Sequence, residues 1–291
     1  MNNNDPGAHP PYTTEFCERE YNARAAIPEH PQIFARWAQD GAAARRQRAC
    51  MLDLPYGESA AERLDIFPTR RADAPLFVFI HGGYWRSLDK ADFSWLAPPL
   101  VDRGIAVALP NYGLAPATPI EDIVRQMLAA LAWLYRRADE LGFDRERIVV
   151  AGHSAGAHLA AMMAAALWPR YAPDLPADLV KGALLVSGVF DLEPLVYAPF
   201  VNVDLKLDVE RARRLSPVYL PPATAAPVAL AVGAEESSEF KRQSELLAAR
   251  WSSNVVRSFE VAGRNHLTVC DALADAGSLL FAAASDLVRR A

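Results

Sequence analysis

The stretch Ile148-Val149-Val150-Ala151-Gly152-His153-Ser154-Ala155-Gly156 decides the fold. Its first four residues form an apolar run of strand length, and the alanine-rich residues from 157 to 168 are typical of a helix. Between them stands the pattern G-x-S-x-G, which holds a serine hydroxyl above the end of a sheet on a sharp strand-to-helix turn. The pattern predicts that Ser154 is a nucleophile, and the alternative is a glycine-rich turn without a catalytic role.

The alternation of apolar runs and helical patterns extends through most of the chain. Short buried strands that alternate with helices predict an α/β fold, with a mostly parallel central sheet and helices on both of its faces. Ligands of such sheets bind at the carboxyl ends of the strands. The expected strands are residues 63–67, 76–80, 105–109, 147–151, 183–186, 228–232 and 255–261, and the expected helices are residues 120–138, 155–168, 240–251 and 272–287.

Two segments depart from this alternation. Residues 1–50 carry two helical patterns and are expected to form an N-terminal helical cap segment. Residues 190–227 are rich in proline and weakly periodic. A connection of this length inside a compact domain is usually functional or disordered, so it predicts a lid-like insertion over the strand ends, with a plain surface excursion as the alternative.

Composition excludes several classes of protein. The chain has 291 residues, 52% of them hydrophobic, and a net charge of −5, without a basic stripe for nucleic acid. Three widely spaced cysteines without a C-x-x-C pair suit a reducing compartment and predict no zinc site. The longest stretch of small apolar residues, 160–168, is too short to span a membrane. We therefore expect a cytoplasmic protein that binds neither membrane nor nucleic acid, with the oligomeric state open and a homodimer among the options.

A second glycine motif, His81-Gly82-Gly83-Tyr84-Trp85, directly follows an expected strand. Acyl transfer places negative charge on the carbonyl oxygen, which fixed N–H donors must stabilise in an oxyanion hole. Glycine lets a backbone approach that closely, so the loop around Gly82 is expected to supply the amides of Gly83 and Tyr84. The amide of Ala155, after the nucleophile, is the third expected donor. His81 is expected to brace the loop rather than to act as a base.

Elimination identifies the base. In this architecture the order along the chain is serine, acid, histidine, and only His158 and His266 follow Ser154. His158 lies four residues into the same helix, where a packing role is expected. His266 follows the last expected strand in a loop that can reach over the sheet, so we expect His266 to be the general base.

The acid should follow the strand at 228–232, where the loop contains glutamates but no aspartate. Spacing from the strand favours Glu236. Glu235 and Glu239 are the alternatives to it, or are solvated loop charges, and Asp191, after the preceding strand, is a more distant candidate. A glutamate can orient an imidazole if its loop retreats by the length of one methylene group.

These motifs resemble the arylformamidase (kynurenine formamidase) branch of the α/β-hydrolase superfamily, close to the hormone-sensitive-lipase-like esterases. The resemblance covers nearly the whole chain and is carried by H-G-G-x-W at 81–85, by G-H-S-A-G-A-H-L at 152–159, and by residues 20–24, 111–116, 186–194 and 236–244. It implies a single α/β-hydrolase domain over 1–291 and an acid at Glu236, where animal members usually have aspartate. It also implies hydrolysis of N-formyl-kynurenine to kynurenine and formate.

The expected chemistry is that of a serine hydrolase with a Ser-His-Glu triad and an acyl-enzyme, acting on a small-molecule amide or ester without metal or organic cofactor. A formyl group needs a small acyl pocket, whereas the aryl-amine side needs aromatic walls. The candidates for these walls, each of which could equally belong to the core, are Trp85, Tyr112, Tyr197 and Phe200. A short-chain carboxylesterase of broad specificity is the alternative function, and a catalytically silent hydrolase-fold binding protein is a more remote one.

Overall fold

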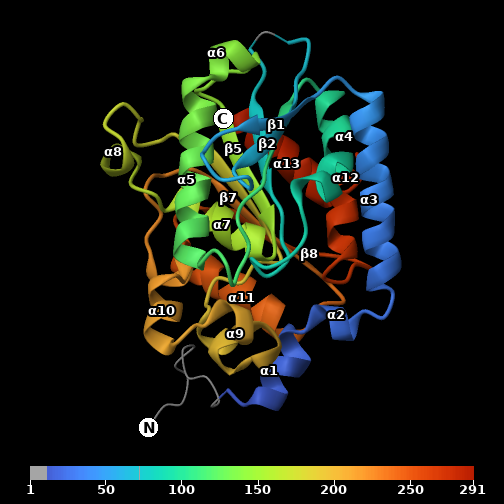
Figure 1. Ribbon diagram of the computed structural model, residues 1–291, viewed down its shortest axis with the longest axis vertical. Coiled ribbons are helices and arrows are strands. Elements are labelled where there is room, and N and C mark those ends of the chain that lie inside the picture. Colours follow the sequence, from blue (N-terminus) through green and yellow to red (C-terminus); the bar gives the residue numbers. More distant parts are fainter. Residues whose placement is uncertain (1–11, 72) are drawn as a thin grey trace.

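A single eight-stranded sheet forms the centre of the protein, whose structure is a computed structural model that describes residues 12–71 and 73–291 (Figure 1). The strand order is β1-β2-β4-β3-β5-β6-β7-β8. Strand β2 pairs antiparallel with both of its neighbours, β1 and β4, and all other pairs of neighbouring strands are parallel. The strands are β1 Met51–Pro55, β2 Arg63–Phe67, β3 Leu76–Ile80, β4 Ala106–Pro110, β5 Ile148–His153, β6 Gly182–Val186, β7 Val228–Gly233 and β8 Val255–Val261. The mostly parallel α/β sheet expected from the sequence is thus confirmed.

Helices cover both faces of the sheet and divide the core into two clusters (Figure 1). Helices α5, α7 and α11 pack on one face, and α3, α4 and α13 on the other. The α-helices are α1 Thr14–Tyr21, α2 Ala23–Ala26, α3 His30–Gln47, α4 Ala97–Val101, α5 Ile120–Arg136, α6 Ala138–Leu141, α7 Ala155–Ala164, α8 Trp168–Tyr171, α9 Pro199–Leu205, α10 Val209–Arg214, α11 Ser238–Arg250, α12 Asp271–Ala274 and α13 Leu279–Arg290; the 3₁₀ helices are η1 Lys90–Leu96, η2 Glu193–Tyr197, η3 Pro217–Tyr219 and η4 Thr268–Cys270.

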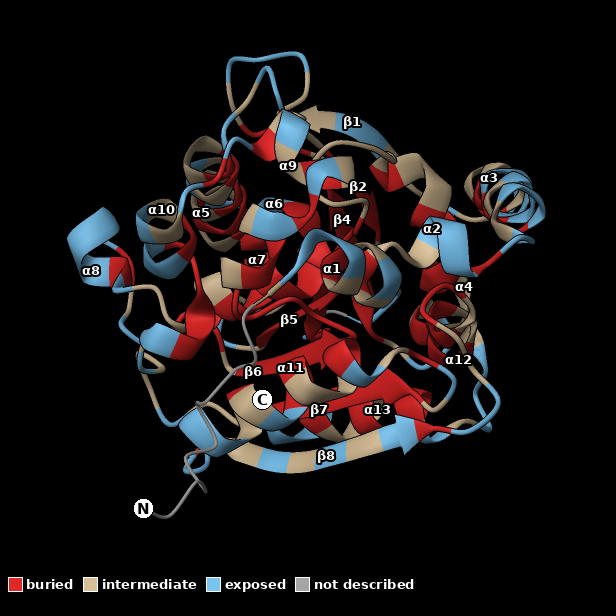
Figure 2. Ribbon diagram, turned by 90° about the horizontal axis from the view of Figure 1, so that it is seen from below, coloured by how far each residue is buried: buried red, intermediate tan, exposed pale blue. Residues whose placement is uncertain are grey.

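Burial explains why the strands were legible in the sequence. Strands β3 to β7 are buried at every residue, because helices lie on both faces, and their sequences are continuous apolar runs (Figure 2). Strand β8 lies at the edge of the sheet and alternates between half-buried and exposed residues. Strand β1, which the sequence analysis missed, is also an edge strand; its register shifts between Met51 and Leu54, which removes the alternation that would have identified it.

The helix boundaries differ from expectation in the two alanine-rich stretches. The helix expected over 155–168 ends at Ala164, and a separate short helix, α8, follows from Trp168. The helix expected over 272–287 is divided into α12 and α13 by a turn at residues 275–278, where the hydroxyl of Ser278 caps the second helix. No single helix within residues 12–71 and 73–291 is long and apolar enough to cross a membrane. The helical segments 268–274 and 279–290, which are bent relative to each other, reach the required length and apolar composition only when they are taken together.

The N-terminal segment and residues 190–227 meet at one end of the sheet. Figures 1 and 2 both place α1 over this end, with α2 and α9 beside it. Contacts between α1 and both η2 and α9 join the two segments. Residues 1–11 of the predicted cap segment lie outside the described residues. Residues 190–227 fold into η2, α9, α10 and η3; their role as a lid stays a prediction.

Candidate active site

The turn between β5 and α7 presents Ser154 in a strained conformation. Its φ is 56°, in the left-handed region that non-glycine residues rarely adopt. A Cβ atom at Gly152 would overlap the carbonyl of Gly156, and one at Gly156 would overlap the carbonyl of Ile80. Both flanking positions therefore require glycine, because the turn brings backbone from three elements into contact.

A series of hydrogen bonds joins Ser154 to a histidine and a glutamate. The Oγ of Ser154 lies 3.1 Å from Nε2 of His266, and Nδ1 of His266 lies 2.6 Å from Oε2 of Glu236. All three residues are buried. Because the carboxylate accepts a hydrogen bond from the Nδ1–H group, it leaves Nε2 as the acceptor that faces the serine hydroxyl.

The second oxygen of Glu236 is also held. Its Oε1 accepts hydrogen bonds from the hydroxyl of Ser187, at 2.5 Å, and from the amide of Gly233, at 2.6 Å. Ser187 follows β6 at a φ of 51°. The sequence analysis missed Ser187, since a lone serine after a strand gives no signal without knowledge of the strand order. With every carboxylate oxygen bonded, the orientation of Glu236 is fixed.

The other acid candidates lie elsewhere. Glu235 is exposed, as the reading of a solvated loop charge predicts. For Glu239 that reading is wrong: this residue is buried, pairs with Arg242 at 2.8 Å, and accepts a hydrogen bond from the hydroxyl of Tyr21 at 2.7 Å. The carboxylate of Asp191 accepts a hydrogen bond from the amide of Glu193. Glu239 lies in the first turn of α11, where its partners are Arg242 and Tyr21.

Three further histidines surround the site in buried positions. Nε2 of His153 donates a hydrogen bond to the carbonyl of His266, 2.7 Å away, and burial together with the nearby His266 ring lowers the pKa of His153 well below the usual value. His158 bonds the carbonyl of Leu215 at 2.7 Å through Nε2 and packs edge-on against Trp85, and burial lowers its pKa to about 4. His158 therefore lies away from the serine, in the packing position that its place on the helix suggests.

The depressed pKa of His158 predicts acid sensitivity. Between pH of about 6.5 and about 4, the unfolded chain binds a proton at His158 that the native protein does not. Protonation then favours unfolding, so the free energy of unfolding falls as the pH drops through this window. For His158→Gln, the loss of stability between about pH 7.5 and 4.5, measured by urea unfolding, should be smaller than in the wild type by about 2 kcal/mol. An equal loss in both proteins would contradict this assignment.

The H-G-G loop lies directly beside the serine. A Cβ at Gly82 would touch the Cβ of Ser154 and the carbonyl of His153. Gly83 has a φ of 104° and Tyr84 a φ of 52°. Their two amides donate to no backbone or side-chain acceptor in the described part of the chain. Ala155 is the first residue of α7, where amides lack an intrahelical acceptor. The three expected oxyanion donors thus belong to residues beside Ser154, and neither the loop nor the helix supplies their amides with a hydrogen-bond acceptor.

His81 braces this loop from below. Its Nδ1 lies 2.8 Å from the carbonyl of Gly82, and its Nε2 lies 2.9 Å from Oδ1 of Asn111. The ring of Tyr112 stacks on His81 at 4.3 Å, and its hydroxyl donates to the carbonyl of His81 at 2.8 Å. Burial lowers the pKa of His81, which keeps the imidazole neutral. His81 consequently holds the loop and does not contact Ser154 or His266.

Gly83→Ala is expected to lower kcat about 10²-fold with a smaller effect on KM. A Cβ at this position would overlap the carbonyl of Ser87, at a φ that side chains rarely adopt, so the loop must shift and misalign its amides. Steady-state kinetics would measure this change. Gly142→Ala, also at positive φ but with open space around it, is the matched control for backbone strain and should keep its kcat. A normal kcat in Gly83→Ala would show that the amides of this loop do not act as oxyanion donors.

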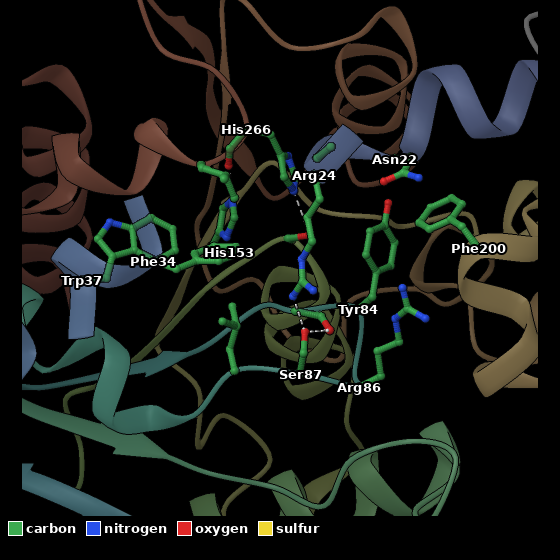
Figure 3. Close-up of a pocket in the computed structure, with 15 residues that line it drawn as sticks. Asn22, Arg24, Phe34, Trp37, Tyr84, Arg86, Ser87, His153, Phe200 and His266 are labelled. Carbon is green, nitrogen blue, oxygen red and sulfur yellow. Dashed lines mark hydrogen bonds between the residues drawn. The ribbon is translucent and has the colours of Figure 1, made fainter. Parts of the chain in front are cut away.

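Ser154 contributes to the lining of a pocket that is open to solvent (Figure 3). It lies between the H-G-G loop and the N-terminal segment and is lined by Asn22, Ala23, Arg24, Phe34, Trp37, Gly83, Tyr84, Arg86, Ser87, Leu88, His153, Ser154, Phe200, His266 and Leu267. Phe200 is in the wall, as expected, and packs edge-on against Tyr84. The sequence analysis missed Phe34 and Trp37, which reach the site from α3.

Three predicted wall residues are not in this pocket. The indole of Trp85 is fully buried against His158 in the core. Tyr112 is buried beneath the loop, stacked on His81. Tyr197 is 37% exposed, and its ring faces Tyr12 rather than the serine. Trp85 and Tyr112 thus help to shape the loop from its core side, while Tyr84 takes the place in the wall that had been expected for Trp85.

The described residues offer no site of three or more histidine, cysteine or carboxylate side chains suited to a metal ion. Within residues 12–71 and 73–291 the three cysteines are free thiols, with Cys17 and Cys270 buried. Burial raises the pKa of Cys17 to about 11 and that of Cys270 well above its usual value, so both remain protonated at neutral pH.

Known proteins resemble this chain over most of its length. A family described as BD-FAE matches residues 64–168. "Kynurenine formamidase" of Danio rerio is 34% identical over 81% of this chain and 81% of its own. A crystal structure from Silicibacter sp. TM1040, of a protein provisionally named a thioesterase, has a TM-score of 0.80 and 34% identity, covering 91% of this chain and 97% of that one. EstE1, a thermophilic carboxylesterase from a metagenomic library, shares the fold with a TM-score of 0.69 and 24% identity, covering 91% and 98% of the two chains.

Proposed function

The chain belongs to the kynurenine formamidase branch of the α/β-hydrolase superfamily and is a hydrolase, and on this premise we propose that it cleaves N-formyl-kynurenine to kynurenine and formate by serine catalysis. The observation that carries the proposal is the series of hydrogen bonds from Glu236 through His266 to Ser154, which ends in the pocket. The substrate is a small molecule, and the reaction uses only groups of the protein and water.

In the first step, Nε2 of His266 removes the proton from Ser154 as Oγ attacks the formyl carbon. The carboxylate of Glu236 stabilises the imidazolium that forms and keeps its ring in place. The amides of Gly83, Tyr84 and Ala155 stabilise the negative charge on the carbonyl oxygen. The imidazolium then donates its proton to the aryl nitrogen, the C–N bond breaks, and kynurenine leaves.

In the second step, water replaces the amine. His266 removes a proton from this water, which attacks the formyl-serine, and the same amides stabilise the second tetrahedral oxyanion. Return of the proton to the Oγ of Ser154 releases formate and restores the enzyme. The neutral state of the neighbouring His153, which burial enforces, leaves His266 free of a second positive charge in both steps.

The same machinery fits an ester, and this is the second candidate function. The similar structure from Silicibacter carries a thioesterase name at 34% identity, and Glu236 stands where animal formamidases usually have aspartate. A short-chain carboxylesterase of broad specificity would use the same three residues. The aromatic wall of Phe34, Trp37 and Phe200 favours the aryl amide, because an aromatic leaving group fills it better than a simple alcohol does.

The test is a comparison of kcat/KM for N-formyl-kynurenine and p-nitrophenyl acetate with the purified protein. For an ester of a simple alcohol, ethyl acetate, compared in the same way, we expect the formamide to be preferred by about tenfold or more, since one well-filled aromatic contact contributes about 1.4 kcal/mol. Preference for the acetate would establish the carboxylesterase instead. If the protein turned over neither substrate, the remaining hypothesis would be a catalytically silent binding protein with the hydrolase fold.

A further inference from the structure

The pocket above Ser154 is electrostatically one-sided. Its fifteen lining residues include Arg24 and Arg86 but no aspartate or glutamate (Figure 3). A second pocket shares His266 with it and is lined by acidic residues, namely Glu20, Glu29, Glu235 and Glu236, together with Arg19. An anionic group entering the site is therefore attracted to the first pocket and repelled from the second.

The two arginines of the first pocket differ in their partners. Arg86 forms an ion pair with Asp204, with 2.7 Å between Nη1 and Oδ2. Arg24 has no aspartate or glutamate within ion-pair distance anywhere in residues 12–71 and 73–291. Partial burial, and to a smaller extent the neighbouring Arg86, lower the pKa of Arg24, although a guanidinium stays protonated at neutral pH. The positive charge of Arg24 thus lacks a counter-ion.

The guanidinium of Arg24 points into the pocket (Figure 3). Its Nη2 donates to the hydroxyl of Ser87 at 2.6 Å, and this hydroxyl donates to the carbonyl of Gly83 at 3.0 Å. A guanidinium has five N–H donors in a planar fork that matches a carboxylate. One contact to Ser87 leaves donors for a ligand, and since Arg24 lies on the exposed helix α2, a ligand can reach them from solvent.

We propose that Arg24 binds a carboxylate of the substrate and thereby selects acyl donors that carry both a carboxylate and an aromatic ring. The proposal rests on the proposed function and specifies its substrate class. Phe34 lies under the guanidinium, with 5.3 Å between the ring centroid and Cζ, and Trp37 and Phe200 continue the aromatic wall. The pocket therefore combines one unpaired cation with apolar walls, which is the composition that an aromatic carboxylate requires.

A structural role for Arg24 predicts a different result. If Arg24 only supported the H-G-G loop through Ser87, its loss would lower kcat for charged and neutral substrates alike. A carboxylate contact instead acts on charged substrates, and through KM, because the contact is equal in the ground state and the transition state. The ratio of the two kcat/KM values separates these roles even if the variant is less active overall.

The experiment compares meta- and para-acetoxybenzoate with the matching acetoxybenzamides, which have the same shape without the charge. For the better isomer, the wild type should prefer the carboxylate about tenfold or more in kcat/KM, with less preference at high salt. Arg24→Gln should reduce this ratio by about tenfold to hundredfold, mainly through KM, and Arg24→Lys should restore part of it. Arg125→Gln, which removes an exposed arginine of α5, is the charge-matched control and should keep the ratio.

A wild-type ratio near one, or an equal loss of both substrates in Arg24→Gln, would overturn the proposal. Calorimetric binding of benzoate and benzamide to Ser154→Ala tests the anion site without any hydrolysis. Failure of this proposal is thereby distinguished from failure of the proposed function. Benzoate should bind more tightly than benzamide, and the added Arg24→Gln change should remove this difference whether or not the protein hydrolyses any ester. Equal binding of benzoate with and without Arg24 would also refute the anion site.

Discussion

Ser154→Ala is expected to lower kcat by about 10⁴-fold to 10⁶-fold, because it removes the atom that forms the acyl-enzyme. The loss corresponds to about 5 to 8 kcal/mol of transition-state stabilisation. KM should change much less, since the pocket walls stay in place. Steady-state rates of N-formyl-kynurenine hydrolysis, or of acetate ester hydrolysis, measure the effect.

The fold should survive this substitution. Alanine is smaller than serine, and the turn is held by Gly152 and Gly156, so thermal unfolding of the variant should match the wild type within a few degrees. Ser59→Ala, at an exposed position, is the matched control and should keep full activity. The double variant with His266→Ala should be about as slow as Ser154→Ala alone, because the residues act as a unit. Substantial activity in Ser154→Ala would refute serine catalysis.

Glu236→Gln is expected to lower kcat by about 10³-fold to 10⁴-fold. The amide presents to Nδ1 of His266 either an oxygen without the negative charge or an NH₂ group, which favours the wrong tautomer of the imidazole. The loss corresponds to about 4 to 5 kcal/mol in the activation free energy. The steady-state rate of substrate hydrolysis measures the change.

Glu235→Gln is the matched control for this prediction. Glu235 is the adjacent residue, has the same charge and is exposed, so its loss should change kcat by less than about twofold. Ser187→Ala, which removes a hydrogen bond to Oε1 of Glu236, should fall between the two, at about tenfold. The reverse order of Glu235 and Glu236 would move the acid by one residue and contradict the geometry of the loop after β7.

The sequence was sufficient to predict the central sheet and the hydrogen-bonded series of Ser154, His266 and Glu236, and there is a physical reason for each. Strands buried on both faces are continuous apolar runs, so β3 to β7 were recognisable from composition alone. Ser154, Glu236 and His266 each follow a strand, and the carboxyl ends of parallel strands lie at one edge of the sheet. The strand order then brings together residues that are between 30 and 112 positions apart, by difference of their numbers.

The pocket walls were less predictable, because side-chain direction depends on loop conformation. Tyr84 and Trp85 are neighbours, both at positive φ, yet one lines the pocket and the other is buried in the core. Phe34 and Arg24 reach the site from helices that the sequence assigns only to a cap segment. Their position depends on long-range contacts, such as the hydrogen bond from the hydroxyl of Tyr84 to the carbonyl of Tyr21, at 2.6 Å.

The central claim is that Ser154 becomes covalently acylated during turnover. Reaction of the native protein with a fluorophosphonate probe, followed by peptide mass spectrometry, tests it directly. We predict a single adduct, on the peptide that contains Ser154, whose amount rises in proportion to the loss of hydrolysis. An adduct on another residue that tracks the lost activity, or fully active protein that stays unlabelled, would contradict the claim.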